Sequence, residues 1–320
     1  MAEKPLVSVL CMTYNQENTI AQTIEGVLMQ ETDFVVELII HDDASTDQTA
    51  AIVRDYAARF PTKVRAIFQT RNQYTGGNLW RRFLLPVSHG AYVAICEGDD
   101  YWTDPEKLQQ QVAYMRAHPD CALCFHAVDQ LGADGSAAPF RPLKATGDVS
   151  PHTLVRRGGL FCPTASLVFR RDVLERWPAF RQNADTYDYP AQLLAATVGT
   201  VHYIDRVMAA YRFGVGNSWT ARQAGEVDVR HIENETNWLW QFDAYTAGRF
   251  RQDVRYHLAL LWLAAYRKKQ SEEIKNTLKG YIYQLSGKDK RVLQGLFWLF
   301  WLCRRHSERV WQVIRKCAYR

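Results

Sequence analysis

The sequence contains no hydrophobic run of the roughly 20 residues needed to cross a bilayer. Its first residues also lack the basic region and small-residue cleavage site of a secretory signal, so we expect a cytoplasmic protein. The seven cysteines are scattered and lie mostly in apolar runs, which favours reduced, buried thiols over a disulfide framework. Cys121 and Cys124 have redox or metal spacing, but no second CxxC exists, so we expect core thiols.

Signature motifs of several enzyme classes are missing as well. No GxGxxG follows the first apolar run, which argues against a dehydrogenase, and no GxxxxGK[ST] is present, which argues against a P-loop nucleoside triphosphatase. Neither a GxSxG elbow nor an HExxH zinc motif occurs. The 320 residues show no internal repeat and suffice for one large domain or two.

Positive charge is concentrated at one end of the chain. Residues 286–320 hold nine Lys and Arg against two acidic residues, a net charge of +7. The whole chain carries +5, so residues 1–285 sum to −2. We therefore expect the two ends of the chain to have different tasks.

Short apolar runs alternate with helical patterns in the first hundred residues. The predicted strands are Leu6–Met12, Phe34–Ile40, Lys63–Gln69 and Ala91–Cys96, and the predicted helices between the first three are Glu17–Gln30 and Asp47–Phe60. This alternation is typical of an α/β domain with a largely parallel sheet covered on both faces. From about residue 221 the pattern becomes helical, with Ser271 at a good helix start.

Three polar clusters follow predicted strands, at the edge where such sheets bind ligands. In the first, Thr13–Glu17, the amides and hydroxyls suit a nucleobase edge, although Asn15 would also serve as a helix cap. In the second, Ser45 and Gln48 have the spacing of a capping box. The neighbouring Asp42 and Asp43 are well placed to accept hydrogen bonds from a ribose or a base.

The third cluster, after the fourth strand, is acidic. Glu97, Asp99 and Asp100 lie on a turn that Gly98 permits, while Asp104 precedes Pro105 as a predicted helix cap. Oxygen ligands without His or Cys favour Mg²⁺ or Mn²⁺, which commonly sit between carboxylates and substrate phosphates. Without a P-loop, this combination indicates group transfer away from a nucleotide-linked diphosphate.

These clusters carry a resemblance to a known family. The segments "VSVLCMTYNQE", "ELIIHDDASTDQT", "GAYVAICEGDDYWTDPEKLQQQ" and "YDYPAQLLAATVGTVHYIDRVMAAYR" resemble the family 2 glycosyltransferases with the GT-A fold, over roughly Pro5 to Trp219. Within the family, the chain is similar to bacterial enzymes that build capsule, O-antigen or related surface glycans. The resemblance implies a Rossmann-like mixed, mostly parallel sheet flanked by helices. It places the catalytic domain in residues 1–220, with a nucleotide-sugar half (1–127) and an acceptor half (128–220), before a helical region (221–320).

The resemblance also implies roles for individual residues. The nucleotide-sugar residues are Thr13, Asn15, Glu17, Asp42, Asp43, Glu97, Gly98, Asp100 and Arg212, with Asp99 as the ligand of Mn²⁺ or Mg²⁺. Glu97 departs from the family, which more often has Asp at that position of its DxD motif. Arg212 would contact the diphosphate, although a surface ion pair is an alternative. The general base is Asp188, with Asp185 as second choice. The reaction is an inverting transfer of a sugar from a nucleotide sugar, and a UDP-sugar is the preferred donor.

The basic tail leaves several functions open. "VLQGLFWLFWLCRR" (Val292–Arg305) is apolar all round and then basic, which fits either a core helix or a helix at a membrane surface. We favour contact of residues 288–320 with the inner face of the cell membrane, and no nucleic-acid partner. This would suit a lipid-linked saccharide as acceptor.

Three functions of the chain other than glycosyl transfer stay open. They are those of a nucleotidyltransferase, a glycoside hydrolase and a non-catalytic sugar-nucleotide-binding or scaffold protein.

Overall fold

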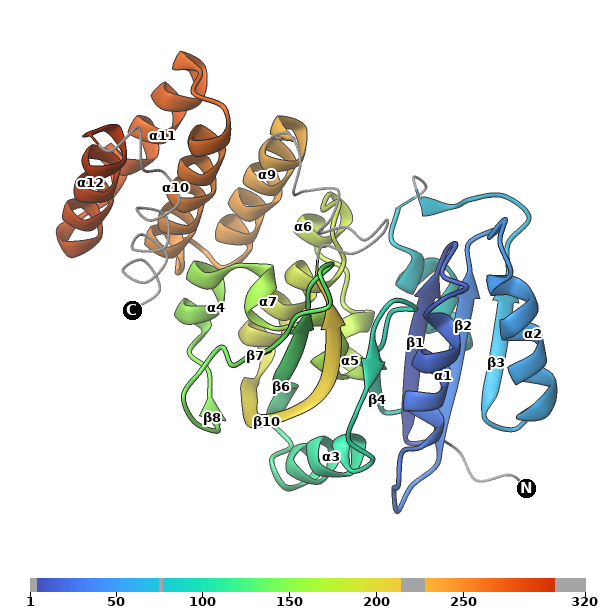
Figure 1. Cartoon of the computed structure of the whole chain (residues 1–320). Helices are drawn as coiled ribbons and strands as arrows, with labels where there is room; N and C mark the ends of the chain where they lie inside the picture. Colours follow the sequence, from blue (N-terminus) through green and yellow to red (C-terminus); the bar gives the residue numbers. More distant parts are fainter. Residues whose placement is uncertain (1–4, 75–76, 214–227, 303–320) are drawn as a thin grey trace. The chain divides into compact units, whose positions relative to one another are not determined.

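The structure is a computed structural model of the chain that describes residues 5–74, 77–213 and 228–302 (Figure 1). The chain divides into two compact units. One holds the described residues up to Pro151 and from Gly159 to Phe213, and the other holds His152–Gly158 and the described residues from Asp228 onward. The predicted boundary near residue 220 lies outside the described residues.

One mixed sheet organises the first unit. Its strands are β1 (Val7–Thr13), β2 (Val36–Asp42), β3 (Val64–Phe68), β4 (Tyr92–Ile95), β5 (Tyr101–Trp102), β6 (Cys121–Leu131), β7 (Ala137–Phe140), β8 (Gly147–Asp148), β9 (Val168–Arg170) and β10 (Thr200–Arg212). Their order is β3-β2-β1-β4-β9-β6-β10-β5, with β7 beside β6 and β8 beside β10. β1 runs parallel to β2 and β4, β2 to β3, and β6 to β10, whereas the short strands β5, β7, β8 and β9 pair antiparallel.

The predicted α/β fold with a mostly parallel sheet is confirmed. The helices of this unit are α1 (Ile20–Leu28), α2 (Thr49–Arg59), α3 (Lys107–Ala117), α5 (Arg171–Glu175), α6 (Ala179–Gln182) and α7 (Asp188–Val198). Val7 and Val9 of β1 share a core cluster with Ile20 and Ile24 of α1. Leu10, on the other face of β1, is fully buried too, so this strand is covered on both sides. Burying each such side chain contributes about 1.5–3 kcal/mol.

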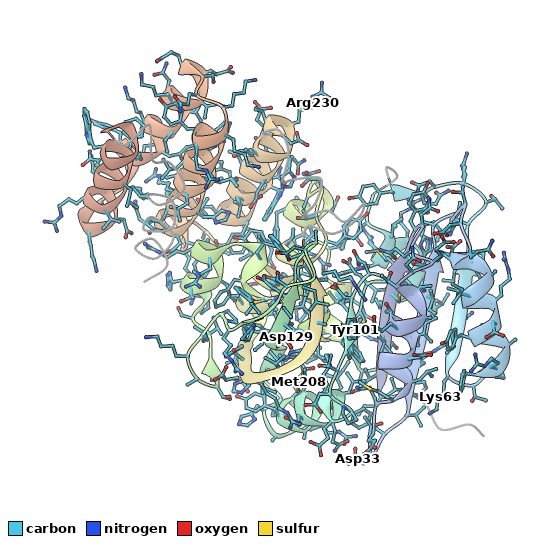
Figure 2. The ribbon with its side chains drawn as sticks, viewed as in Figure 1. Asp33, Lys63, Tyr101, Asp129, Met208 and Arg230 are labelled. Carbon is cyan, nitrogen blue, oxygen red and sulfur yellow. The ribbon has the colours of Figure 1, made fainter. Side chains whose placement is uncertain are left out.

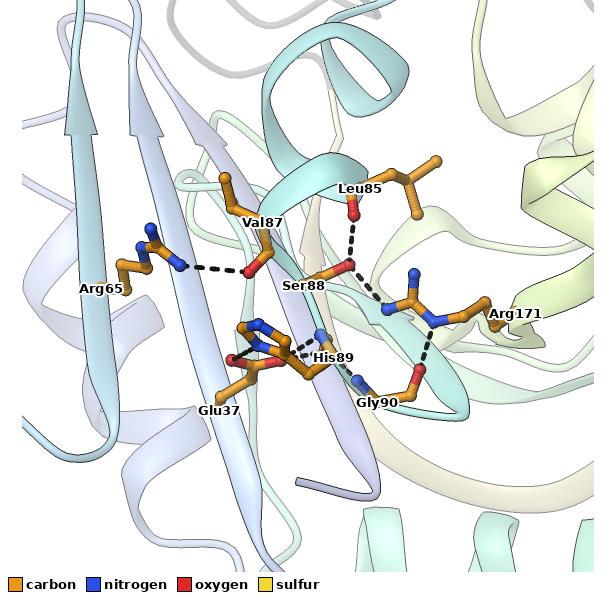
Figure 3. A network of polar contacts seen from close by, with 9 residues as sticks. Glu37, Arg65, Leu85, Val87, Ser88, His89, Gly90 and Arg171 are labelled. Carbon is orange, nitrogen blue, oxygen red and sulfur yellow. Dashed lines mark hydrogen bonds and ion pairs between the residues drawn. The ribbon is translucent and has the colours of Figure 1, made fainter. Parts of the chain in front are cut away.

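A polar network lies at the end of the sheet where β1 begins (Figure 3). The Ser8 hydroxyl donates to Glu37 (2.6 Å) and accepts from the Gly90 amide (2.8 Å). The Arg171 guanidinium reaches the Ser88 hydroxyl from the start of α5 (2.7 Å). A Cβ on Gly90 would lie 2.4 Å from the Ser8 nitrogen, so only glycine fits there. This network fixes the chain leading into β4, and therefore the strand that carries the acidic cluster.

The second unit is helical. Its helices are α4 (Pro151–Arg157), α9 (Val229–Tyr245), α10 (Arg251–Lys268), α11 (Glu272–Gln284) and α12 (Gly287–Leu302). Helix α10 contacts α9, α11 and α12. The Ser271 hydroxyl accepts from the Ile274 amide, which confirms the predicted helix start.

Helix α12 has two different faces in its described part. Leu293, Leu296 and Phe297 are buried, whereas Trp298 is 57% exposed. Phe297 packs against Tyr266 of α10 with 6.0 Å between ring centroids. One face of α12 is therefore core, and the other presents an aromatic side chain. In the part of the chain that the structure describes, no helix has the length and apolar character to cross a membrane; residues 303–320 of the predicted tail lie outside it.

Candidate active site

The acidic cluster forms a loop between β4 and β5. The Gly98 amide donates to the Met12 carbonyl of β1 (2.9 Å), and the Gly98 carbonyl accepts from Thr19 (2.7 Å). A Cβ on Gly98 would lie 2.4 Å from Gln16 Oε1 and 2.8 Å from the Thr13 side chain. Its φ lies outside the left-handed region, so close packing requires the glycine here, rather than a turn conformation. We call Glu97–Asp100 the acidic loop.

Burial and mutual repulsion disfavour the charged forms of these carboxyl groups. The pKa of Glu97 is raised to about 8 by burial and by the nearby charges of Asp99 and Asp188. Burial also raises the pKa of Asp99. The pKa of Asp100 is raised by burial and by Asp99. A loop of this kind favours a binding partner of positive charge.

Arg212, at the end of β10, brings a positive charge to this loop. Its amide donates to Asp100 Oδ1 (2.9 Å), and its guanidinium donates to the Asp99 carbonyl and to Gln22 Oε1 (2.6 Å). The guanidinium also lies 4.9 Å from the ring centroid of Tyr101, a residue labelled in Figure 2. These contacts join Arg212 to the acidic loop, and its contact with a diphosphate stays a prediction.

Asp188 approaches the acidic loop from the first turn of α7. The Thr164 hydroxyl donates to Asp188 Oδ2 (3.1 Å). The charge of Asp188 contributes to the raised pKa of Glu97, so the two carboxylates lie close enough to interact. Asp185 lies before this helix and is exposed. Of the two candidate bases, Asp188 therefore lies near the acidic loop, whereas Asp185, three residues earlier in the sequence, is exposed.

The loops after β1 and β2 hold each other in place. Asn15 has φ of 53° and accepts from the Thr46 amide through Oδ1 (2.8 Å). Glu17 Oε2 accepts from the Gln48 amide (2.9 Å). The capping box predicted for Ser45 and Gln48 is wrong, because the Ser45 hydroxyl accepts from the Asn15 amide (3.0 Å) and α2 has no side-chain cap. Asn15 likewise does not cap α1, whose N-cap is Thr19.

The paired aspartates after β2 are both buried and differ in their contacts. Asp43 Oδ1 accepts from the Gln73 amide (2.7 Å) and so anchors the segment after β3. Asp42 Oδ2 accepts from the Ser45 amide (3.3 Å), whereas its Oδ1 is buried without a hydrogen-bond partner among the described residues. Thr13, at the end of β1, donates to Gln16 Oε1 (2.7 Å). These residues thus lie together at the carboxyl ends of β1 and β2.

Sequence reasoning missed two tyrosines of this region. The pKa of Tyr211 is raised by burial and by the charges of Asp100, Glu97, Asp188 and Asp99, so its phenol lies near enough to these carboxyl groups to interact with them. The pKa of Tyr187 is raised to about 12 by burial and by Tyr74, with Glu97 and Asp43 also contributing. Tyr211 directly precedes Arg212, and Tyr187 directly precedes Asp188. This position next to a predicted site residue could have identified both tyrosines from the sequence.

The acidic loop has the donors that a hard divalent cation prefers, namely carboxylate oxygens. Asp100 Oδ2 is buried and has no hydrogen-bond partner within the described ranges, as expected for an atom that awaits a cation or its water. Among these same residues no group of three or more His, Cys, Asp or Glu side chains could hold a metal ion by itself. The carboxylate oxygens of the acidic loop, with the unpartnered Asp100 Oδ2 among them, are donors compatible with a divalent cation.

The sequence of this chain identifies its family. The model of the family described as "Glycosyl transferase family 2" matches residues 8–177, more than half of the chain, and the chain belongs to this family. An uncharacterized protein of Mycobacterium tuberculosis is 37% identical over 214 residues, which are 67% of this chain and 60% of that protein. The putative teichuronic acid biosynthesis glycosyltransferase TuaG of Bacillus subtilis is 33% identical over 133 residues, which are 42% of this chain and 50% of that protein. The matched part of the chain thus spans 60% or less of the length of these relatives.

Solved structures show the same fold. TarS of S. aureus (residues 1–349), in complex with UDP-GlcNAc, superimposes with a TM-score of 0.64 at 18% identity, covering 90% of this chain and 86% of that chain. The mannosyltransferase PcManGT of Pyrobaculum calidifontis, in complex with GDP-Man and Mn²⁺, superimposes with a TM-score of 0.57 at 17% identity, covering 99% of this chain and 85% of that chain. The GT-A architecture expected from the sequence is confirmed.

Proposed function

We propose that this chain is an inverting, metal-dependent glycosyltransferase of bacterial surface polysaccharide synthesis. It moves a sugar from a nucleotide sugar, with a UDP-sugar as first choice, to a hydroxyl of a glycan or lipid-linked saccharide. The observation that carries the proposal is the convergence of the acidic loop, Arg212 and Asp188 at one edge of the sheet. TarS, crystallised with UDP-GlcNAc, and TuaG, named for teichuronic acid synthesis, support the choice of donor and pathway class.

The proposed chemistry is a single displacement. The Asp188 carboxylate accepts the proton of the acceptor hydroxyl while that oxygen forms a bond to the anomeric carbon of the donor. The bond from this carbon to the diphosphate oxygen breaks, and the nucleoside diphosphate leaves with the electron pair. General-base assistance of this kind accelerates a reaction by about 10²–10⁴-fold. Thr164, by its hydrogen bond, holds the carboxylate in one orientation.

The other residues of the site bind the donor. Thr13, Asn15, Glu17, Asp42 and Asp43 receive the nucleotide at the carboxyl ends of β1 and β2. Arg212 orients the acidic loop beside the diphosphate, and Glu97, Gly98 and Asp100 line the donor sugar. A divalent cation, Mn²⁺ or Mg²⁺, would be held by Asp99 and, when bound, supplies positive charge that offsets the charge developing on the diphosphate. The presence of Mn²⁺ in PcManGT supports this assignment.

Calorimetric titration of UDP, GDP and dTDP with and without Mn²⁺ tests the donor site. We expect one nucleotide to bind tightly, only with the metal, and not to bind Asp99→Asn. Asp188→Asn should bind the same nucleotide with unchanged affinity but lose about 10²–10⁴-fold in transfer rate. Absence of nucleotide binding under every metal condition would refute the transferase assignment. Binding without transfer, unchanged by Asp188→Asn, would favour a non-catalytic sugar-nucleotide-binding protein.

We also propose a cytoplasmic location with peripheral contact to the inner membrane face. Support comes from the exposed Trp298, the net charge of +7 in residues 286–320, and the exposed Lys288 and Arg291. Co-sedimentation with vesicles of phosphatidylglycerol and phosphatidylcholine tests it. We expect binding that requires the anionic lipid and weakens in Trp298→Ala, whereas equal binding to neutral vesicles would contradict the proposal.

A further inference from the structure

A polar pocket lies within the helical unit. It has a volume of about 380 Å³ and is lined by residues of α9, α10 and α11 and of the turn between the last two. The α9 residues Val229, Glu233, Thr236 and Asn237 recur at helical spacing and so form one face of that helix. Thr277 and Tyr281 of α11 are one turn apart. Pockets that hold small ligands begin at about 300 Å³, so this one is large enough for a sugar-sized molecule.

The charges around the pocket disfavour an anionic ligand. Glu233 and Glu273 contribute two carboxylates, and Lys269 contributes one ammonium group, so the lining has a net charge of −1. Binding sites for phosphate groups instead gather Arg or Lys side chains or helix N-termini free of acidic residues. A nucleotide or a lipid phosphate is therefore disfavoured.

The remaining lining suits a neutral ligand rich in hydroxyl groups. Asn237 offers an amide that donates and accepts, and Thr236 and Thr277 offer hydroxyls. Tyr281 is partly exposed and provides apolar surface with a polar tip, which suits the C–H face of a sugar ring, whereas Trp262 is a buried lining residue. A saccharide presents both kinds of surface at once.

Two lining residues also carry polar atoms without partners. Thr236 Oγ1 and Trp262 Nε1 are buried, and neither has a hydrogen-bond partner in the described part of the chain. Buried donors are almost always paired, so an unpaired one calls for an explanation, such as an ordered water or a bound molecule. The two exceptions fall on residues of the same pocket.

We propose that the helical unit carries a second, non-catalytic saccharide site between α9 and α11. It takes a neutral oligosaccharide, with a sugar ring against Tyr281, near Trp262, and hydrogen bonds to Asn237 and Thr277. That this oligosaccharide is a stretch of the acceptor glycan rests on the proposed function, whereas the preference for a neutral saccharide rests on the pocket alone. Such a site would retain a growing glycan between successive encounters with the catalytic unit.

Fluorine NMR of the full chain labelled with 5-fluorotryptophan tests the site. The signal of Trp262 is identified by its disappearance in Trp262→Phe. The probes are maltotetraose, N,N′-diacetylchitobiose and laminaritriose at millimolar concentrations, with inorganic phosphate for comparison. We expect at least one saccharide to move the Trp262 signal saturably, with phosphate having no effect.

Matched variants decide whether the pocket is responsible. Asn237→Ala should weaken saccharide binding by about tenfold, the loss expected for one good hydrogen bond. Asn276→Ala, an exposed residue of α11 outside the pocket, should bind as the parent does. The proposal is overturned if no saccharide moves the Trp262 signal, if Asn237→Ala titrates like the parent, or if phosphate moves the signal equally.

The same labelled protein separates this proposal from the proposed catalytic function. Asp188→Asn should lose transfer and keep the saccharide-dependent shift of Trp262. A protein that binds saccharide at Trp262 but binds no nucleotide would refute the transferase assignment and leave the second site standing. Nucleotide-dependent transfer without any shift of the Trp262 signal would support the transferase assignment and refute the second site.

Discussion

Thr164 and Asp188 are separated by 24 residues, and a single hydrogen bond of 3.1 Å joins their side chains. Thr164 is nearly buried in a 3-10 turn, Thr164–Ser166, and Asp188 begins α7. A hydrogen bond to a charged group contributes about 1.5–3 kcal/mol. At the scale of single residues, we therefore regard Thr164 as a positioning residue for the proposed base.

Thr164→Val should lower kcat by about ten- to a hundredfold, because the carboxylate loses the donor that orients it. The KM for the nucleotide sugar should change little. Thr164→Ser keeps the hydroxyl and should restore most of the rate. Steady-state kinetics of both variants check this, and equal rates for Val and the parent would contradict the role of Thr164.

Lys107 is a second residue whose behaviour depends on its surroundings. It is fully buried, donates to Gln111 Oε1 (2.8 Å) and lies 4.0 Å from the ring centroid of Trp102. Burial lowers its pKa from 10.5 to about 7. Between these two values the unfolded chain holds a proton that the folded chain has lost, so this lysine destabilises the fold less as the pH rises.

The free energy of unfolding of Lys107→Met, minus that of the parent, should therefore fall between pH 7 and about pH 10. The expected slope is about 1.4 kcal/mol per pH unit. Urea denaturation of both proteins across this range measures it, and the buried cysteines, which titrate in both, largely cancel in the difference. A flat difference would mean that Lys107 remains charged in the folded protein.

At the scale of elements, the acidic loop depends on its close packing against the end of β1. Gly98→Ala should displace the loop, because the new methyl group would overlap Gln16 and Thr13. We expect a loss of about 1–3 kcal/mol in stability and at least about tenfold weaker nucleotide binding.

Gly147→Ala is the matched control for this substitution. Gly147, in β8, has open space around its Cβ position and no left-handed φ, so it should tolerate alanine. Thermal unfolding and nucleotide titration of both variants check the comparison. Equal effects at the two glycines would show that the acidic loop is not constrained by packing.

At the scale of the whole molecule, the helical unit includes a segment from within the first unit's sequence. Arg156, on the inserted helix α4, forms ion pairs with Asp289 (2.7 Å) and Asp253 (3.3 Å) and lies 3.9 Å from the ring centroid of Tyr256. Asp253 is nearly buried, and His152 of the same helix also contacts it. Arg156 therefore ties α4 to α10 and α12.

Arg156→Leu should destabilise the helical unit by about 1–3 kcal/mol, because it leaves two carboxylates without their shared cation, one of them buried. This figure is reduced for the partial exposure of the arginine side chain. Arg230→Leu, on the surface of α9 (Figure 2), should be nearly neutral. Chemical denaturation measures both, and similar losses would argue against a special role for Arg156.

The sequence by itself determined the first four strands, the two helices between the first three of them, the three polar clusters and the family. Each of these follows from local patterns, such as apolar periodicity and the position of polar residues at strand ends, which act over a few residues. The acidic loop and Asp188 could be selected as candidates for the same reason, since each lies in a short segment that resembles the family. Even the predicted start of α11 at Ser271 rests on four adjacent residues.

Only the tertiary structure decided which partners these residues take. Ser45 was predicted to cap its own helix, but the Asn15 amide, 30 residues away, occupies its hydroxyl. The Arg212 amide donates to Asp100, 112 residues away. Lysine side chains are usually exposed, but Lys107 is buried against Trp102 and Gln111. A side chain's partner depends on which strands become neighbours in the sheet. That choice is a property of the whole fold, because the burial of all the strands together sets its free energy.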